Sequence, residues 1–537
     1  MICNKTVHTL LLCATTLSVG LLPLPVLAIE ANDKHDTVIY NNTIEPPTLD
    51  PQLAGDTTSD AVISQLFEGL TVRDNKGQTV SGVAKSWDNK DNLIWTFHLR
   101  EDSRWSDGSP VTAQDFVYSF RRLVDPKTAS PNGMYLAQAY VKGAAEAAIG
   151  KASVEDLGVK AIDDHTLEIT LTQPLAYFID MLALPALSPV KQSVIEKYGD
   201  SWTKAKNIVV NGPYLLTNHV VNEKIEFKKN PTYWDRDHVT IPHVIFLEIS
   251  NPLSAYNRYR ANELHIAVVS FPVTLLEKAK KEYPQEYHRS PIACTSSVAF
   301  NMKKVADVRV RKALQLAFDR DAIDNKVFKG SLAITYSLTP TYMNNANFTI
   351  PDEISNLTQK QRNEKARKLL EEAGYNKNNP LVLTYSYATA PSNQQFAIAL
   401  AAMYKQNIDV IIKLDNQEWK TLLQNTQQGN FEFVQRIWCA DYNDPSTFLD
   451  TLMTSNSNNM GSYHSADFDK LMAEVLTAPN ATALHALYQK AEDLIARDAP
   501  IIPYATIVSN TLRKPWLKGL GESPFPGTSF KFYSIEN

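Results

Sequence analysis

The 537-residue chain has no marked excess of charge of either sign. Its 53 Lys and Arg and 58 Asp and Glu residues give a formal net charge of −5. A protein that binds nucleic acid is expected to carry a basic face, so this composition argues against nucleic acid as a partner. Low-complexity segments and short repeats are also absent from the sequence. With 44% hydrophobic residues, the chain can bury a large core and form two or three domains.

Long apolar runs are lacking everywhere except near the N-terminus. There, an apolar run over 10–27 follows the basic residue Lys5 and ends in a small residue, Ala28. This order is typical of a secretory signal peptide, and we expect export and cleavage after about Ala28. A retained membrane anchor is the alternative, which Pro23 and Pro25 near the end of the run disfavour.

Cysteines are few, and their positions fit an exported protein. Of the four, Cys3 and Cys13 would leave with the signal peptide, so the mature chain would keep Cys294 and Cys439. An isolated pair in an oxidising compartment favours one disulfide, and two separate buried thiols are the alternative. Neither cysteine has a second Cys or a His at ligand spacing, so we expect no metal site there.

Local catalytic motifs are also missing. The sequence contains no GxSxG elbow, no HExxH, no P-loop and no GxGxxG after a strand. Its eleven His residues are scattered, and Asp163-Asp164-His165 directly precedes a predicted strand, where a turn is expected. We therefore expect no enzyme, no cofactor and no bound metal, although active sites need not follow local motifs.

Hydrophobic periodicity predicts a large mixed α/β protein with discontinuous lobes. Thr112 and Asp115 have the spacing of a helix capping box. Gly374 stands where a helix C-cap is expected. Strands are predicted over 37–40, 94–100, 166–171, 224–227, 409–414 and 431–434, and helices over 59–70, 308–318, 359–373, 394–404, 465–476 and 483–496.

One short stretch, residues 436–445, gathers aromatic and polar side chains directly after a buried-looking strand. Asp441 lies in it beside Trp438 and Cys439. A carboxylate that is sheltered and rigidly held can accept charge-assisted hydrogen bonds from a ligand ammonium. The alternative is a structural Asp that caps the turn before Asn443.

Many blocks along the mature chain resemble the periplasmic oligopeptide-binding proteins of Gram-negative bacteria (solute-binding protein family 5) and their murein-tripeptide-binding relatives. The blocks, in order, are 49–51 (LDP), 66–70 (LFEGL), 82–84 (GVA), 95–100 (WTFHLR), 105–108 (WSDG), 111–119 (VTAQDFVYS), 211–214 (NGPY), 230–235 (NPTYWD), 416–421 (NQEWKT), 438–443 (WCADYN) and 514–516 (KPW).

This resemblance implies an α/β, type II periplasmic-binding-protein-like fold of three lobes, two of which close over a ligand by a hinge motion. It implies a Cys294–Cys439 disulfide, a short peptide as ligand and an inner-membrane ABC permease as partner. A monomer in the periplasm is expected. The expected segments are the signal peptide 1–28, lobe I formed by 29–66, 190–293 and 509–537, lobe II formed by 67–189, and lobe III formed by 294–508.

The resemblance carries over to the ligand site unevenly. Asp441 matches the anchor of the peptide α-amino group, Trp438 and Trp419 match neighbouring tryptophans, and Asn458 matches a pocket amide. Elsewhere the chain departs from the family. A cleft acid is replaced by Gly55 next to Asp56, a cleft Tyr is replaced by Asn132, and a Gly is replaced by Ile437. Tyr-rich runs are replaced by 295–298 (which includes Ser297) and 505–507, and carboxylate-receiving residues are replaced by neutral ones near Asn393, Thr426 and Gln435. Arg436 lies one residue from a family Arg and is expected to point to the other side of the strand.

The expected ligand-binding set is Asp441, Trp438, Trp419, Asn458, Ala440, Cys439, Ile437, Ser297, Asn132 and Asp56. A retained amine anchor with an altered wall predicts a peptide or peptide-like ligand. A narrowed aminated ligand, a cell-wall peptide or a non-transport receptor on the same fold are the alternatives.

Overall fold

The computed structural model describes residues 36–268, 273–456, 458–520, 523–525 and 529–536. The expected signal peptide, residues 1–28, lies outside them. No helix within these ranges combines the length and apolar character needed to cross a bilayer.

An eleven-stranded sheet forms the frame of the described chain, in the order β15-β14-β16-β12-β17-β11-β1-β10-β9-β8, with β13 paired to β17. Its strands are β1 (Thr37–Asn41), β8 (Tyr214–Val220), β9 (Lys224–Lys229), β10 (His243–Leu247), β11 (Ile266–Val268), β12 (Tyr287–Phe300), β13 (Ala333–Ile334), β14 (Val382–Ala388), β15 (Ile411–Gln417), β16 (Phe433–Cys439) and β17 (Ile501–Arg513).

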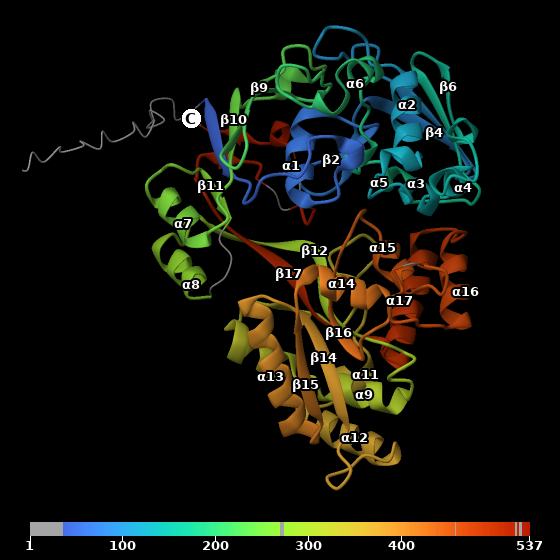
Figure 1. The fold of residues 1–537 in the computed structure, drawn as a ribbon, viewed down its shortest axis with the longest axis vertical. Coiled ribbons are helices and arrows are strands. Elements are labelled where there is room, and N and C mark those ends of the chain that lie inside the picture. The colour runs from blue at the N-terminus through green and yellow to red at the C-terminus, as the bar shows by residue number, and fades with distance from the viewer. Residues whose placement is uncertain (1–35, 269–272, 457, 521–522, 526–528, 537) are drawn as a thin grey trace, which may run out of the picture. The chain divides into compact units, whose positions relative to one another are not determined.

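Two long antiparallel strands, β12 and β17, connect the two halves of this sheet (Figure 1). At one end β17 pairs with β11, and at the other end β12 pairs with β16. The β12–β17 register shifts between Pro291 and Thr295 and again between Ser296 and Ser297. Because a proline lacks the N–H that a sheet ladder needs and a bulge interrupts pairing, the ladder is weakened at this connection.

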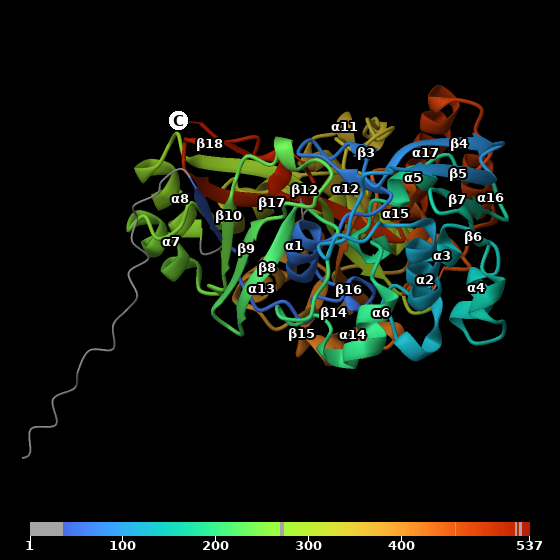
Figure 2. The same cartoon turned by 90° about the horizontal axis from the view of Figure 1, so that it is seen from above.

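A second, four-stranded sheet has the order β4-β5-β7-β6 and falls within the segment expected for lobe II. Helix α2 packs against it (Figure 2). The capping box predicted from Thr112 and Asp115 is confirmed at the start of α2. The elements here are β4 (Ala84–Lys90), β5 (Ile94–Leu99), β6 (Val159–Asp163), β7 (Thr166–Thr170) and α2 (Ala113–Val124), with the neighbouring hairpin of β2 (Thr71–Arg73) and β3 (Thr79–Ser81). The lobe boundaries themselves stay a prediction.

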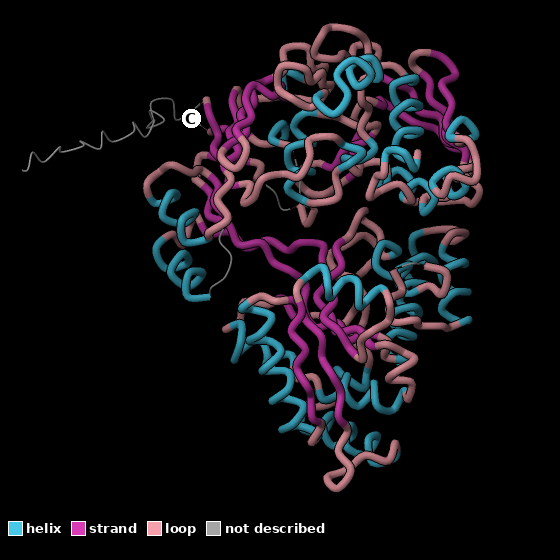
Figure 3. Tube along the Cα trace, viewed as in Figure 1, coloured by secondary structure: helices cyan, strands magenta, loops and turns pink. Residues whose placement is uncertain are grey.

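In the later half of the chain, α13 (Pro391–Ile408) connects the parallel strands β14 and β15 and lies beside them (Figure 3). Phe396 and Tyr404 of α13 pack with Phe318 in a core of buried aromatics. The other long helices of this half are α9 (Val308–Ala317), α12 (Gln359–Glu372), α16 (Ala466–Val475) and α17 (Ala481–Asp498).

The remaining elements are short or lie at the margins of the sheets. They are α1 (Thr57–Leu66), α3 (Tyr135–Gln138), α4 (Ala144–Ala148), α5 (Phe178–Met181), α6 (Gln192–Tyr198), α7 (Pro252–Arg260), α8 (Val273–Glu282), α10 (Arg320–Ile323), α11 (Asp352–Ser355), α14 (Trp419–Gln427), α15 (Ser446–Leu449), β18 (Leu517–Lys518) and β19 (Ser534–Ile535).

Several predicted elements have other bounds in the structure, and two of them show the physical reason. The helix expected over 59–70 stops at Leu66, because Phe67 is extended and the backbone N–H of Glu68 donates to the side-chain oxygen of Asn211. The strand expected over 431–434 starts at Phe433 and runs on to Cys439, because β12 continues to pair with it. This extension places Arg436 and Trp438 inside a strand.

Candidate ligand-binding site around Asp441

The pairing of β12 with β16 assembles one group of the predicted site residues. Ser297 lies opposite Arg436, and Ile437 and Trp438 follow along the same strand. The strands end in register at Cys294 and Cys439, and the predicted disulfide between these two residues is confirmed. The adjoining Ala440 donates its backbone N–H to the carbonyl of Ala293 over 2.7 Å. The backbone directly before Asp441 is therefore held in place.

Two hydrogen bonds to Thr447 hold the loop that carries Asp441. The Asp441 backbone N–H donates to the Thr447 hydroxyl over 3.0 Å, and the Trp438 indole N–H donates to the Thr447 carbonyl over 2.7 Å. The turn that follows is capped by Asp444, whose Oδ1 accepts from the backbone N–H of Ser446 over 3.0 Å.

The Asp441 carboxylate is left available. Across the described part of the chain, no donor is bonded to its oxygens, although the residue is half-buried. Burial raises the pKa of Asp441 to about 6, against the neighbouring Arg73, which lowers it. A sheltered carboxylate without a donor is suited to accept an ammonium group.

Arg73, at the end of β2, reaches the backbone of Asp441 from the segment expected for lobe II. Its guanidinium donates to the backbone carbonyl of Asp441 and lies over the ring of Phe525, 4.4 Å from the ring centroid. Sequence analysis missed Arg73. It ends a three-residue strand and lies 368 positions from Asp441, so no local pattern marks it.

Two acidic residues, Asp56 and Asp60, lie at the start of α1. Asp56 caps α1 by accepting from the backbone N–H groups of Thr58 and Ser59. Asp60 lies one turn further on, and burial raises its pKa to about 7, with the charges of Asp56 and Asp441 adding to the increase and Arg73 opposing it. The charges of Asp56, Asp441 and Arg73 all act on Asp60, so α1, β2 and the loop after β16 converge here.

The structure also explains the glycine that stands in place of a family acid. A Cβ at Gly55 would lie 3.0 Å from the Pro131 side chain, so no larger side chain fits without a shift. The next residue, Asn132, donates its side-chain amide to the Ala54 carbonyl over 2.7 Å. Gly55 and Asn132 therefore form a tight contact between two first-half loops.

The other predicted residues occupy more peripheral positions. Trp419 begins α14 with 60% of its surface exposed, and no contact found among the described residues joins it to Asp441. Asn458 is half-buried, and its backbone N–H donates to the Asn456 side chain over 2.8 Å. Ile437 is 49% exposed, whereas Ser297 is buried.

One group of side chains could ligate a metal, away from Asp441 in sequence and in a different part of the sheet. The ligand atoms of Glu45, His219 and Glu248 all lie within 4.8 Å of one another. The His219 ring and the backbone N–H of Asn222 already bond Glu45, over 2.8 and 2.7 Å. Burial and the Glu45 charge raise the pKa of Glu248 to about 8, so a proton can occupy this group as well as a cation.

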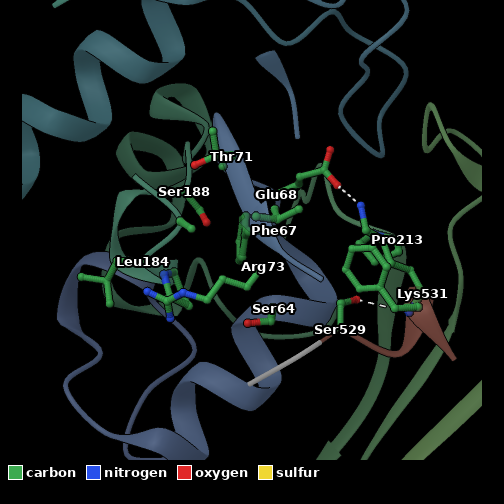
Figure 4. Close-up of a pocket in the computed structure, with 15 residues that line it drawn as sticks. Ser64, Phe67, Glu68, Thr71, Arg73, Leu184, Ser188, Pro213, Ser529 and Lys531 are labelled. Carbon is green, nitrogen blue, oxygen red and sulfur yellow. Dashed lines mark hydrogen bonds and ion pairs between the residues drawn. The ribbon is translucent and has the colours of Figure 1, made fainter. Parts of the chain in front are cut away.

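A small cavity of about 50 Å³ lies between Phe67, Ser188 and Lys531 (Figure 4). Two of its charged groups satisfy each other: Lys531 donates to Glu68 over 2.7 Å, and the Trp234 indole donates to the same carboxylate over 2.6 Å. The Arg73 side chain extends away from Glu68 in this view. We therefore interpret this cavity as part of the core.

Residues 78–460 match the family described as bacterial extracellular solute-binding proteins, family 5 Middle. The chain belongs to this family. It is 45% identical over 495 residues to the periplasmic oligopeptide-binding protein OppA of Escherichia coli K12, covering 92% of this chain and 91% of that one. It is 41% identical over 478 residues to the periplasmic murein peptide-binding protein MppA of the same organism, covering 88% of each.

Solved structures of related proteins agree with the assignment of this chain to the solute-binding protein family. The crystal structure of Haemophilus influenzae OppA in complex with RPPGFSPFR has a TM-score of 0.80 and 39% identity, and the match covers 94% of this chain and 100% of that one. The predicted mixed α/β fold of a periplasmic binding protein, and the resemblance inferred from the sequence blocks, are confirmed.

Proposed function

We propose that this solute-binding protein captures short peptides or peptide-like solutes in the periplasm and delivers them to an inner-membrane ABC permease. In this proposal the exported chain loses its signal peptide after about Ala28, acts as a monomer and does no chemistry on its ligand. Relatives that match more than nine-tenths of their own length are named oligopeptide-binding proteins, which supports the ligand class.

The observation that carries the proposal is the Asp441 carboxylate. It is half-buried, held by a disulfide-anchored backbone, and bonded to no donor in the described chain. An α-ammonium group would supply the missing donors and compensate the burial of the charge. The Trp438 indole is fixed to Thr447, the residue that also holds the Asp441 backbone.

Closure around the ligand follows from the connection between the halves of the sheet. Only β12 and β17 continue the ladder across this point in the described residues, and their register is broken at Pro291. Bending there would move β2 and α1 relative to β16. The Arg73 contact with the Asp441 carbonyl would form on closure and break on opening.

A narrowed aminated ligand is the second candidate, because the pocket wall departs from the resemblance. Gly55 is packed against Pro131, and Ile437 places a branched side chain beside the strand where the family has glycine. The Ile437 side chain would reduce the room along this stretch of β16, while the Asp441 carboxylate would keep its preference for an amine.

Native mass spectrometry of the mature protein, purified without denaturation, distinguishes the two. A heterogeneous set of short-peptide masses is expected for a broad peptide receptor, and one recurring mass for the narrowed version. The protein stripped of ligand should then melt at a higher temperature when the peptides are returned, since a ligand that binds only the folded state stabilises it. If no ligand co-purifies and no di- to pentapeptide raises the melting temperature, the proposal is wrong.

A further inference from the structure

The carboxyl ends of three strands meet at one edge of the large sheet, remote from β16 in the strand order. β1 and β10 pair in parallel, and β9 lies antiparallel between β10 and β8, so β1, β10 and β8 all run in one direction (Figure 2). Glu45 lies in the loop after β1, His219 lies near the end of β8, and Glu248 directly follows β10. The fold therefore brings together three side chains that are far apart in sequence.

His219 and Glu248 project from the same side of this edge. His219 is level with Phe246 of β10, because both residues pair with Ile225 of β9. The ladder continues past the end of β10, where the backbone N–H of Glu248 donates to the carbonyl of Glu223 over 3.2 Å. Alternate residues of a strand share a face, so Glu248, two positions after Phe246, lies on the side of His219.

Glu45 completes the group from the loop after β1. Its Oε1 lies 2.8 Å from Nε2 of His219, and its Oε2 accepts the backbone N–H of Asn222 over 2.7 Å. One ligand atom each of Glu45, His219 and Glu248 all lie within 4.8 Å of one another. Ligand atoms around a tetrahedral zinc ion with bonds of about 2.0–2.2 Å lie about 3.3–3.6 Å apart, so a small shift would bring these three onto one ion.

The Glu248 carboxylate has no donor of its own. Both of its oxygens are closed to solvent, and among the described residues neither has a hydrogen-bond partner. The backbone N–H of Asn222, which also acts on Glu248, donates to Glu45 instead. The ion pairs found in the described chain give Glu45 only His219 as partner and give Glu248 none. A shielded carboxylate beside a second carboxylate needs a positive partner to compensate its lost hydration.

We propose that Glu45, His219 and Glu248 form a binding site for a divalent transition-metal ion, with Zn²⁺ as the expected ion. Zinc accepts an imidazole nitrogen together with carboxylate oxygens, whereas Mg²⁺ and Ca²⁺ prefer oxygen ligands alone. The ion supplies the partner that Glu248 lacks and offsets the charges of both glutamates. The side chains of His219 and Glu45 are 21% and 22% exposed, so water can complete the coordination shell.

This site goes beyond the proposed function, because it shares no residue with the Asp441 site. Its three ligands fall within the segments expected for lobe I, where the ion ties the loop after β1 and the end of β8 to the end of β10. The inference departs from the expectation of no bound metal, which rested on local motifs. No local spacing indicates the site, because each ligand comes from a different element.

Isothermal titration calorimetry of the untagged mature protein, stripped with EDTA and dialysed, measures Zn²⁺ binding at pH 7.5. One ion should bind per chain. His219→Gln and Glu248→Gln each remove one ligand and should weaken binding by at least about tenfold, since even the loss of an outer-shell partner typically costs 10–100-fold. His238→Gln is the matched control, because His238 also lies beside a carboxylate, that of Asp235, but is 84% exposed, and its loss should leave the affinity unchanged.

The melting temperature gives a second readout of the same site. Zn²⁺ should raise it in the unaltered protein and in His238→Gln, and should leave it unchanged in His219→Gln, since an ion that binds only the folded state stabilises that state. The proposal is overturned if the unaltered protein binds no Zn²⁺, or if it binds Zn²⁺ no more tightly than His219→Gln and Glu248→Gln do. Binding of Ca²⁺ or Mg²⁺ as tight as that of Zn²⁺ overturns the transition-metal assignment. Should His219→Gln fail to fold, Glu248→Gln decides on the same criterion.

Discussion

Affinity for peptides with a free α-amino group should fall as the pH drops through about 6. Burial raises the pKa of Asp441 to about 6 in the ligand-free protein, and only the ionised carboxylate attracts an ammonium strongly. Because the bound ammonium favours the ionised form, protons and ligand compete for Asp441. The perturbation is therefore acidification from pH 7.5 to pH 5.

The size of the effect follows from the ionised fraction. With a pKa of about 6, Asp441 is ~97% ionised at pH 7.5 and ~10% ionised at pH 5, so the affinity should weaken by about tenfold. An ordinary aspartate with a pKa of about 3.9 would stay ~90% ionised at pH 5 and would show almost no change. The Asp441→Asn variant loses a charged hydrogen bond worth about 1.5–3 kcal/mol, or roughly 10- to 150-fold at pH 7.5.

The assay is calorimetric titration of a tripeptide and of its N-acetylated form over this pH range. The unaltered protein should prefer the free amine, and this preference should shrink by about tenfold on acidification to pH 5, whereas Asp441→Asn should bind both forms equally at every pH. Asp60→Asn is the matched control, because Asp60 also titrates nearby, with a pKa of about 7, and its removal should leave the midpoint near 6. A pH-independent preference for the free amine in Asp441→Asn would refute the anchor.

Four further outcomes are expected. Arg73→Gln should move the pH midpoint of amine binding upward, because Arg73 lowers the pKa of Asp441, and a downward shift would contradict their contact. Cys294 and Cys439 lie 145 positions apart, and replacing both by Ser should lower the free energy of unfolding by up to about 5 kcal/mol on the chain-entropy model. The melting temperature in scanning calorimetry should then fall by about 5 °C, and an unchanged melting temperature would show that the disulfide constrains the unfolded chain little. Arg122→Met should lower the free energy of unfolding by about 3–5 kcal/mol, because it leaves the Asp50 carboxylate, which is 4% exposed and lies 2.6 Å from the guanidinium, without its ion-pair partner. The control Arg309→Met, at the exposed pair with Asp307, should lower it by no more than about 1 kcal/mol. Equal denaturant midpoints of the two variants would refute this contrast. Glu248 holds a proton in the folded state that the unfolded chain releases above pH 4.5, so the stability of the fold is lost as the pH rises from 4.5 through about 8. The melting temperature of Glu248→Gln, relative to that of the unaltered protein, should therefore rise over that range, and a fall would contradict this assignment.

Local signals predicted much of the fold. The capping box at Thr112, the helix that became α13 and the disulfide each depend on residues close in sequence or on a family pattern, and each is confirmed. The end of α1 was missed because the N–H of Glu68 bonds to Asn211, far along the chain, and long-range contacts override helical propensity.

The candidate site could be predicted only in part, for the same reason. Asp441 could be named, because it stands in a block beside Trp438 and Cys439. Arg73 could not be named, because its role depends on the folded chain bringing β2 against the loop after β16. Among the described residues, the missing hydrogen-bond partner of Arg436 Nη2 and the grouping of Glu45 with His219 and Glu248 are likewise properties of packing, and no spacing in the sequence encodes them.

A crystal structure of the mature protein with a bound tripeptide tests the amine anchor most directly. The account predicts that the peptide α-ammonium nitrogen lies about 2.7–2.9 Å from a carboxylate oxygen of Asp441, the distance of a charge-assisted hydrogen bond. A peptide bound with its ammonium elsewhere, and with Asp441 contacting only protein, would contradict it.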